Sequence, residues 1–264
     1  MSIEMKQAKE LIESFSPLDF QCGWDNTGWN ILSGKNIAEG IYICLDVTEQ
    51  AVSKAYENGC DIILSHHPLL FDPARQIDAG KHKGRIISMI LGKGLSLFCA
   101  HTAVDAAPWG INAFLASALG LNNVSALESD PDGKCGMGFI GDCAEIPASD
   151  AVDRIKKALD TDSVRVGNYD PDRPVKKIAG CGGAGADLID IAFENGADLF
   201  VSGEIKHNYY VDSDDIVLVE AGHYDTEKCF VELACDYLQK RADELKYDIL
   251  IMKDSDTARP YFNL

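Results

Sequence analysis

Short, continuous apolar runs alternate along this chain with longer stretches of helical periodicity. The run at 60–65 (CDIILS) has almost no polar position between its apolar ones, which is typical of a strand buried on both faces of a parallel sheet. The first fifteen residues instead have the charged, amphipathic pattern of a surface helix. Buried strands that alternate with helices predict an α/β fold.

One α/β pattern occurs twice in the sequence. The segment IYICLDVTEQAVSKAYENGCDIILSHH begins at Ile41, and IAGCGGAGADLIDIAFENGADLFVSGE begins at Ile178, a constant offset of 137. Each copy reads as a strand, a turn, a helix, an Asn-Gly helix stop and a second strand, because Asn and Gly tolerate the left-handed conformation that ends a helix. We therefore predict two related, interlinked α/β lobes that arose by internal duplication.

Turn-rich segments suggest where one lobe gives way to the other. The sequence SDPDG at 129–133 reads as a loop, and we take it as the point where the chain leaves the first lobe. The prediction is a metal-binding α/β lobe of residues 1–128 with 221–264, and a second α/β lobe of residues 129–220. The string CGGAG at 181–185 is compatible with a phosphate-binding loop or with a tight strand-to-helix turn.

Histidines and carboxylates follow the predicted strands. His66 and His67 come directly after the run at 60–65, and Pro68 prevents that strand from continuing, so the chain can turn both imidazoles toward one site. Imidazole and carboxylate together suit Zn, Mn, Fe or Ni. The paired histidines and the two clusters named next offer enough ligands for two metal ions bridged by a carboxylate and water. Two similar clusters, each a histidine with an acidic residue four positions later, are His101 to Asp105 and His223 to Glu227.

Composition narrows the possible partners. The chain has 264 residues and a formal net charge of −18, so most of its surface would repel a nucleic-acid backbone. Its nine cysteines form no CxxC pair, and several lie in apolar segments, which indicates buried thiols in a reducing compartment. No apolar run is long enough for a membrane helix, and the N-terminus is not a signal sequence. We expect a cytoplasmic protein that binds neither membrane nor nucleic acid.

Five motifs, in order, carry a resemblance to a known family. GWDNTGW (23–29), SHHPLLF (65–71), AHTAVD (100–105), SGEIKH (202–207) and GHYDTE (222–227) resemble the type 2 GTP cyclohydrolase I-like proteins, also called Nif-three-like proteins. The resemblance implies the Nif-three-like fold and a homohexameric ring whose metal sites face an internal cavity. It also implies two divalent ions per chain, with Glu227 as the bridge. The metal ligands that it implies are His66, His67, Asp105, His223 and Glu227.

Other residues near these motifs have two interpretations each. His101 and His207 either hold a ligand or transfer a proton, or they are hydrogen-bonded structural histidines. His82 reads as a surface residue. Trp24 and Trp29 either form a wall of the pocket or pack at the edge of the lobe.

Two hypotheses about function follow. The first is a metal-dependent hydrolase, possibly of the GTP cyclohydrolase type, that activates a metal-bridging water toward a small-molecule substrate, with His101 as the catalytic proton donor. The alternative is a non-catalytic protein that binds or delivers metal, or an adaptor with structural metals.

Overall fold

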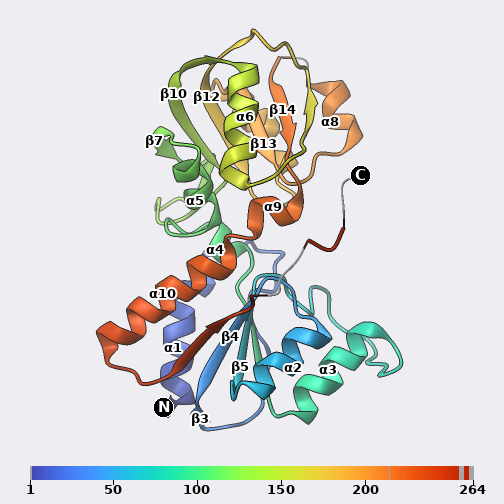
Figure 1. Cartoon of the computed structure of the whole chain (residues 1–264), viewed down its shortest axis with the longest axis vertical. Helices are drawn as coiled ribbons and strands as arrows, with labels where there is room; N and C mark the ends of the chain where they lie inside the picture. The colour runs from blue at the N-terminus through green and yellow to red at the C-terminus, as the bar shows by residue number, and fades with distance from the viewer. Residues whose placement is uncertain (1, 214, 256–258, 262–264) are drawn as a thin grey trace. The chain divides into compact units, whose positions relative to one another are not determined.

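The structure is a computed structural model that describes residues 2–213, 215–255 and 259–261. The chain folds into two compact units. Unit 1 comprises Met1–Val104 and Phe230–Ala258, and unit 2 comprises Asp105–Cys229 and Arg259–Leu264. Each unit is a three-layered α/β structure built on its own sheet (Figure 1). The predicted fold class, two interlinked α/β lobes, is therefore observed.

Unit 1 is built on a five-stranded sheet. Its four parallel strands are almost entirely apolar, as the sequence pattern predicts, and an antiparallel strand joins them at one edge. In spatial order the strands are β15 (Leu250–Lys253), β4 (Gly40–Cys44), β5 (Ile62–Ser65), β6 (Ser96–Cys99) and β2 (Gly28–Ile31). A separate two-stranded sheet pairs β1 (Ile3–Glu4) with β3 (Ile37–Ala38).

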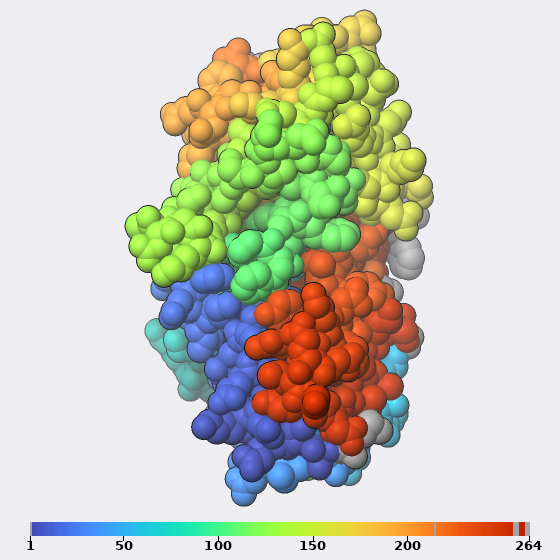
Figure 2. Space-filling view, turned by 90° about the vertical axis from the view of Figure 1, so that its left-hand side faces the viewer, coloured from blue at the N-terminus to red at the C-terminus, as the bar shows by residue number. Residues whose placement is uncertain are grey.

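Helices cover both faces of this sheet. On one face lie α2 (Glu49–Glu57) and α3 (His82–Gly92), and on the other lie α1 (Met5–Phe15) and α10 (Phe230–Leu245) (Figure 1). The N-terminal and C-terminal segments lie side by side in unit 1 (Figure 2), where the rings of Phe15 and Phe230 are 6.0 Å apart. Unit 1 thus includes a helix from near the end of the chain.

Unit 2 has a six-stranded mixed sheet. Its first helical layer is α5 (Ile111–Ala118) and α6 (Ala148–Leu159), and η2 (Ala186–Leu188), α7 (Ile189–Glu194) and α8 (His207–Asp212) pack against the other face. The strands, in spatial order, are β11 (Arg165–Gly167), β14 (Val217–Glu220), β13 (Leu199–Ser202), β12 (Pro174–Cys181), β10 (Phe139–Pro147) and β7 (Asn122–Ser125). A short pair, β8 (Glu128–Ser129) with β9 (Gly136–Met137), lies outside this sheet.

The repeated sequence forms the same structure in each unit. In unit 1 it is β4–α2–β5 and in unit 2 it is β12–α7–β13, with the two strands parallel in both. The registers are the same at the offset of 137, since Ile41 pairs with Ile62 and Ile178 pairs with Leu199. The repeat predicted from the sequence is therefore present as the same strand–helix–strand unit in both units.

The strands that follow the two copies of the repeat, β6 and β14, show one difference. Ala100 donates to the carbonyl of Ser65 and Ala221 donates to that of Ser202, so these two alanines occupy equivalent positions. His101 directly follows Ala100, but Gly222 stands between Ala221 and His223. The two His-x3-carboxylate clusters therefore follow equivalent strands but are shifted by one residue.

The division of the chain differs from the expected one. The structure divides it after Val104 and after Cys229, not after residues 128 and 220. The reason is pairing: β7 joins the second sheet as the neighbour of β10, so α5 and β7 belong to unit 2. The short helix α9 (His223–Glu227) also belongs to unit 2.

Two expectations from composition concern the cysteines and membrane-spanning helices. Cys44, Cys60, Cys99 and Cys181 are buried, and burial raises the pKa of Cys60 to about 12 and that of Cys99 to about 11, so both thiols stay protonated. Among the helices of the described ranges, none is both long and apolar enough to cross a membrane.

Candidate metal centre

The paired histidines are presented by the end of β5. The backbone N–H groups of His66 and His67 both donate to the carbonyl of Leu45, at 3.1 Å each, which turns the chain out of the strand. The two rings lie with their centroids 4.9 Å apart. Consecutive imidazoles therefore lie together at the carboxyl end of the sheet, as Pro68 led us to expect.

His101 joins this pair from the next strand. It follows β6, and its ring centroid is 5.4 Å from that of His66 and 5.9 Å from that of His67. One ring nitrogen from each of the three lies within 4.8 Å of the others, so this group could hold a metal ion. We call these three residues of unit 1 the histidine group.

Unit 2 contains a second set of donors. Asp105 ends α4 (Thr102–Asp105), and His223 and Glu227 lie one turn apart on α9. Nε2 of His223 is 3.0 Å from Oε2 of Glu227, and carboxylate oxygens of Asp105 and Glu227 lie within 4.8 Å of each other. We call these three residues the carboxylate group; both carboxylates in it are buried.

In all four of these histidines, Nδ1 contacts an oxygen atom. His66 Nδ1 lies 2.9 Å from the carbonyl oxygen of Ala100, which can only accept, so the Nδ1 atom carries the proton. In the neutral ring the lone pair is then on Nε2, the arrangement typical of metal-binding histidines. The other three Nδ1 atoms lie 2.7–2.8 Å from carboxylates, in the pairs His67–Asp46, His101–Asp25 and His223–Glu204.

The contact between His223 and Glu227 fits a bound cation. With the proton of the neutral ring on Nδ1, the Nε2 lone pair would face a carboxylate oxygen at 3.0 Å. Two lone pairs at that distance repel unless a metal ion or a second proton lies between them. The donors present, imidazole nitrogens and carboxylate oxygens, are those that Zn, Mn and Fe accept. These residues therefore fit a divalent metal.

Asp25 is a further candidate residue that the sequence reasoning did not single out. Its side chain is fully buried and lies 2.8 Å from Nδ1 of His101. Burial alone would raise the pKa of Asp25, but hydrogen bonds from His101, Thr102 and Thr27 hold it well below the usual range. A carboxylate that stays ionised fixes both the orientation and the tautomer of His101. Asp25 occurs within the motif GWDNTGW, which was the available signal.

The glycine-rich loop at 181–185 has a different role from phosphate binding. The N–H of Gly182 donates to Asn112 and that of Gly183 donates to Thr226, both at 3.0 Å, so these groups are used within the protein. Gly183 has φ +60°, and a Cβ there would collide with the carboxylate of Glu227. The loop is therefore a tight turn that leaves room for Glu227.

Several other candidates lie apart from these groups. His82 and His207 are exposed at the N-termini of α3 and α8, and neither belongs to a potential metal-binding group of the described residues. Trp29 is a packing residue, because its Nε1 donates to Glu13 and its ring meets Phe98 edge-on. Trp24, in contrast, is exposed beside His101.

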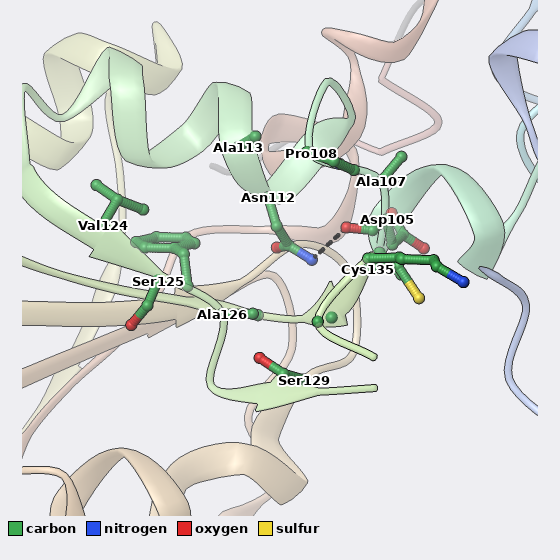
Figure 3. A pocket seen from close by; sticks show the side chains of 16 residues that line it. Asp105, Ala107, Pro108, Asn112, Ala113, Val124, Ser125, Ala126, Ser129 and Cys135 are labelled. Atoms are coloured by element: carbon green, nitrogen blue, oxygen red, sulfur yellow. Dashed lines mark hydrogen bonds between the residues drawn. The ribbon is translucent and has the colours of Figure 1, made fainter. Parts of the chain in front are cut away.

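Two cavities in unit 2 adjoin the carboxylate group. One, of about 390 Å³, has Asp105 and Cys135 at one end and Val124 at the other (Figure 3). The second, of about 410 Å³, is lined by His223 together with Glu204 and other residues. Both are of the size that small-molecule sites have.

Comparison with known proteins identifies the family. The sequence model of Duf34/NIF3 (NGG1p interacting factor 3) matches residues 3–257. The chain belongs to the Duf34/NIF3 family. This confirms the resemblance drawn from the five motifs, and the mixed α/β architecture of both units is that of its relatives.

Two curated relatives and one crystal structure illustrate the similarity of this NIF3 protein to others. A Streptococcus pneumoniae protein named GTP cyclohydrolase 1 type 2 homolog is 26% identical, over 96% of each chain. NIF3-like protein 1 of Drosophila melanogaster is 28% identical over 89% of this chain and 82% of its own. The crystal structure of a Bacillus cereus protein related to NIF3 superposes with a TM-score of 0.92, at 22% identity over 99% of each chain. That last likeness concerns the fold alone.

Proposed function

We propose that this protein binds two divalent metal ions per chain. The ligands would be His66, His67, Asp105, His223 and Glu227, with the Glu227 carboxylate shared by both ions. The observation that carries the proposal is the common orientation of the imidazoles, in which each Nδ1 contacts an oxygen, while Nε2 of His223 lies 3.0 Å from the Glu227 carboxylate. The buried carboxylates supply the negative charge that two cations need.

The path of the chain supports a joint role for the two groups. The chain passes from unit 1 to unit 2 between Val104 and Asp105, and it returns between Cys229 and Phe230. Asp105 is thus the first residue after one crossing, and Glu227 comes three residues before the other. Donors therefore stand next to both crossings in the sequence.

We further propose that the centre is hydrolytic. A pair of bound divalent ions would supply a hydroxide near neutral pH and stabilise the charge that develops during attack. His101 would donate or accept the proton at Nε2, while Asp25 holds its Nδ1–H. The relatives named GTP cyclohydrolase 1 type 2 homolog make GTP the first substrate to test. The cavity beside Asp105 is large enough for a small-molecule substrate.

Metal analysis tests the first proposal. After reconstitution with Zn, Mn, Fe or Ni, elemental analysis should give about two ions per chain. Glu227→Ala should lose most of this metal, because the shared carboxylate serves both ions. Glu194→Ala, an exposed glutamate at the end of α7, is the matched control and should keep both. One ion or fewer per wild-type chain would exclude the dinuclear centre.

Turnover tests the second proposal. The loaded protein should consume GTP or a related heterocyclic or phosphorylated compound, and the rate should fall together with the metal content of Glu227→Ala. Metal content is measured at each pH, because protonation of the histidines would also release the ions. Two confirmed ions with no turnover across a broad panel of hydrolase substrates would assign the protein to non-catalytic metal binding or delivery.

A further inference from the structure

Two aromatic side chains are exposed beside His101 in unit 1. The side chain of Trp24 is 64% exposed and that of Phe71 is 45% exposed. Their ring centroids are 6.0 Å apart, and each lies 6.2 Å from the imidazole of His101. Large apolar groups that gather on a surface next to a candidate site usually have a binding role. We call Trp24 and Phe71 the aromatic pair.

The backbone that carries the aromatic pair is tied down by hydrogen bonds. Next to Trp24, the Asp25 carboxylate accepts from Thr27 and from Thr102, at 2.6–2.7 Å. The side-chain amide of Asn26 donates to the carbonyl of Leu70, which is the residue before Phe71. The N–H of Leu70 in turn donates to the Asn30 side chain at 3.1 Å. These bonds join the two loops, so the backbone that carries the rings is held before any ligand arrives.

The sequence segments that carry the aromatic pair lack basic residues. The segments that carry it and the histidine group, residues 22–31, 65–73 and 99–104, contain no Lys or Arg. A phosphate would find no cationic side chain in these segments, whereas the face of a flat ring can stack on an aromatic side chain whatever its charge. The chemistry offered is therefore that of ring recognition.

We infer that Trp24 and Phe71 form a stacking site for a planar heteroaromatic ring and hold it next to His101. The inference builds on the proposed hydrolytic function, since a ring stacked there lies beside the group assigned to proton transfer. Trp24 and Phe71 both meet His101 at steep angles, 75° and 83° between ring planes, so His101 is itself held in an aromatic setting.

Binding without turnover tests this site directly. Guanosine, GTP and ribose 5-phosphate are titrated into the metal-loaded protein by calorimetry, so that the ring and the phosphate are compared separately. Guanosine and GTP should bind. Trp24→Ala and Phe71→Ala should each weaken guanosine binding by roughly 5–150-fold, the value of one stacking contact of about 1–3 kcal/mol. Trp24→Phe, which keeps an aromatic face, should retain most of the affinity.

A matched control separates stacking from general surface effects. Tyr56, an exposed aromatic residue on α2 in the same unit, is changed to Ala and should leave guanosine binding unchanged. Ribose 5-phosphate has no ring to stack, so its binding should not depend on Trp24. Equal guanosine affinity in wild type and Trp24→Ala would overturn the inference. So would a Trp24→Ala variant that only alters the oligomeric state, since the pair would then be a contact between copies.

The result also separates this inference from the hydrolytic proposal. Guanosine binding that depends on Trp24, in a protein without turnover, would retain the stacking site and remove the hydrolase. Turnover that is unchanged in both KM and kcat by Trp24→Ala would retain the hydrolase and remove the stacking site.

Discussion

At the scale of single residues, the placement of imidazole protons determines what the candidate centre can bind. His66 is the clearest case, because a backbone carbonyl 2.9 Å from its Nδ1 leaves no choice of tautomer for the neutral ring. In three further histidines a carboxylate contacts Nδ1 and favours the same tautomer. Such contacts typically change metal affinity or activity by 10–100-fold when they are removed. The supporting acids Asp46, Asp25 and Glu204 are thus part of the candidate centre.

Gly183 offers a residue-scale test of the carboxylate group. Gly183→Ala should lower metal content, because the new Cβ would displace the carboxylate of Glu227. Part of any effect will come from backbone strain, since φ is +60°. Gly196→Ala is the matched control, because Gly196 has φ +80° in the same unit but has open space at the Cβ position. Metal analysis that shows equal losses in both variants would contradict the proposed role.

The His101–Asp25 pair separates proton transfer from metal binding. His101→Gln should keep both metals and slow turnover by roughly 10²–10⁴-fold, as expected for the loss of a general acid or base. Asp25→Asn should slow turnover by roughly 10–100-fold, because the imidazole loses its orienting carboxylate. Turnover and metal content are measured on the same samples. A loss of metal in His101→Gln would instead make His101 a ligand.

At the scale of secondary structure elements, the two copies of the repeat share more than their order. Each helix ends on an Asn whose side chain donates to the carbonyl four residues earlier, at 2.8 Å: Asn58 to Lys54, and Asn195 to Ile191. A glycine with positive φ follows in both, Gly59 at +74° and Gly196 at +80°. The shared ENG string therefore has the same mechanical function twice.

That equivalence predicts equal costs of substitution. Gly59→Ala and Gly196→Ala should each destabilise the protein by roughly 1–2 kcal/mol, because an L side chain is strained at positive φ and neither site has a neighbour to clash with. Denaturant unfolding of the two variants measures the change in free energy of unfolding. A large loss of unfolding free energy at one site and none at the other would show that the two glycines are not equivalent in ending their helices.

The elements also show what the sequence could and could not predict. The buried strands and the Asn-Gly stops are local patterns, so the repeat was predicted with its residues and register offset. The boundary between units was not, because it depends on β7 (NNVS), a strand exposed at all four positions that is fixed only by pairing with β10. The site could likewise be predicted only in part. Histidines at strand ends are recognisable in the sequence. The contact of Asp46 with His67 could not be predicted, because Asp46 is isolated in sequence and only the fold places it against His67.

At the scale of the whole molecule, the assembly follows from the family resemblance alone and needs its own test. We predict a homohexamer, so light scattering should give about 172 kDa for six copies of the 28.7 kDa chain. The measurement is made on loaded and metal-free protein at several concentrations, because a weak assembly dissociates on dilution. A mass of one or two chains under all conditions would contradict the prediction.

Metal removal tests whether one centre draws on both units. If ligands come from unit 1 and unit 2 together, chelation should lower the thermal stability of both, by at least about 5 °C when the ions were bound well above their dissociation constants. Tryptophan fluorescence can follow each unit separately, because Trp24 and Trp29 lie in unit 1 and Trp109 lies in unit 2. A Trp109→Phe variant reports on unit 1, and a variant with Phe at positions 24 and 29 reports on unit 2. Glu227→Ala, which should bind little metal, controls for effects of the chelator itself. A shift confined to one unit would mean that the metals are held by that unit alone.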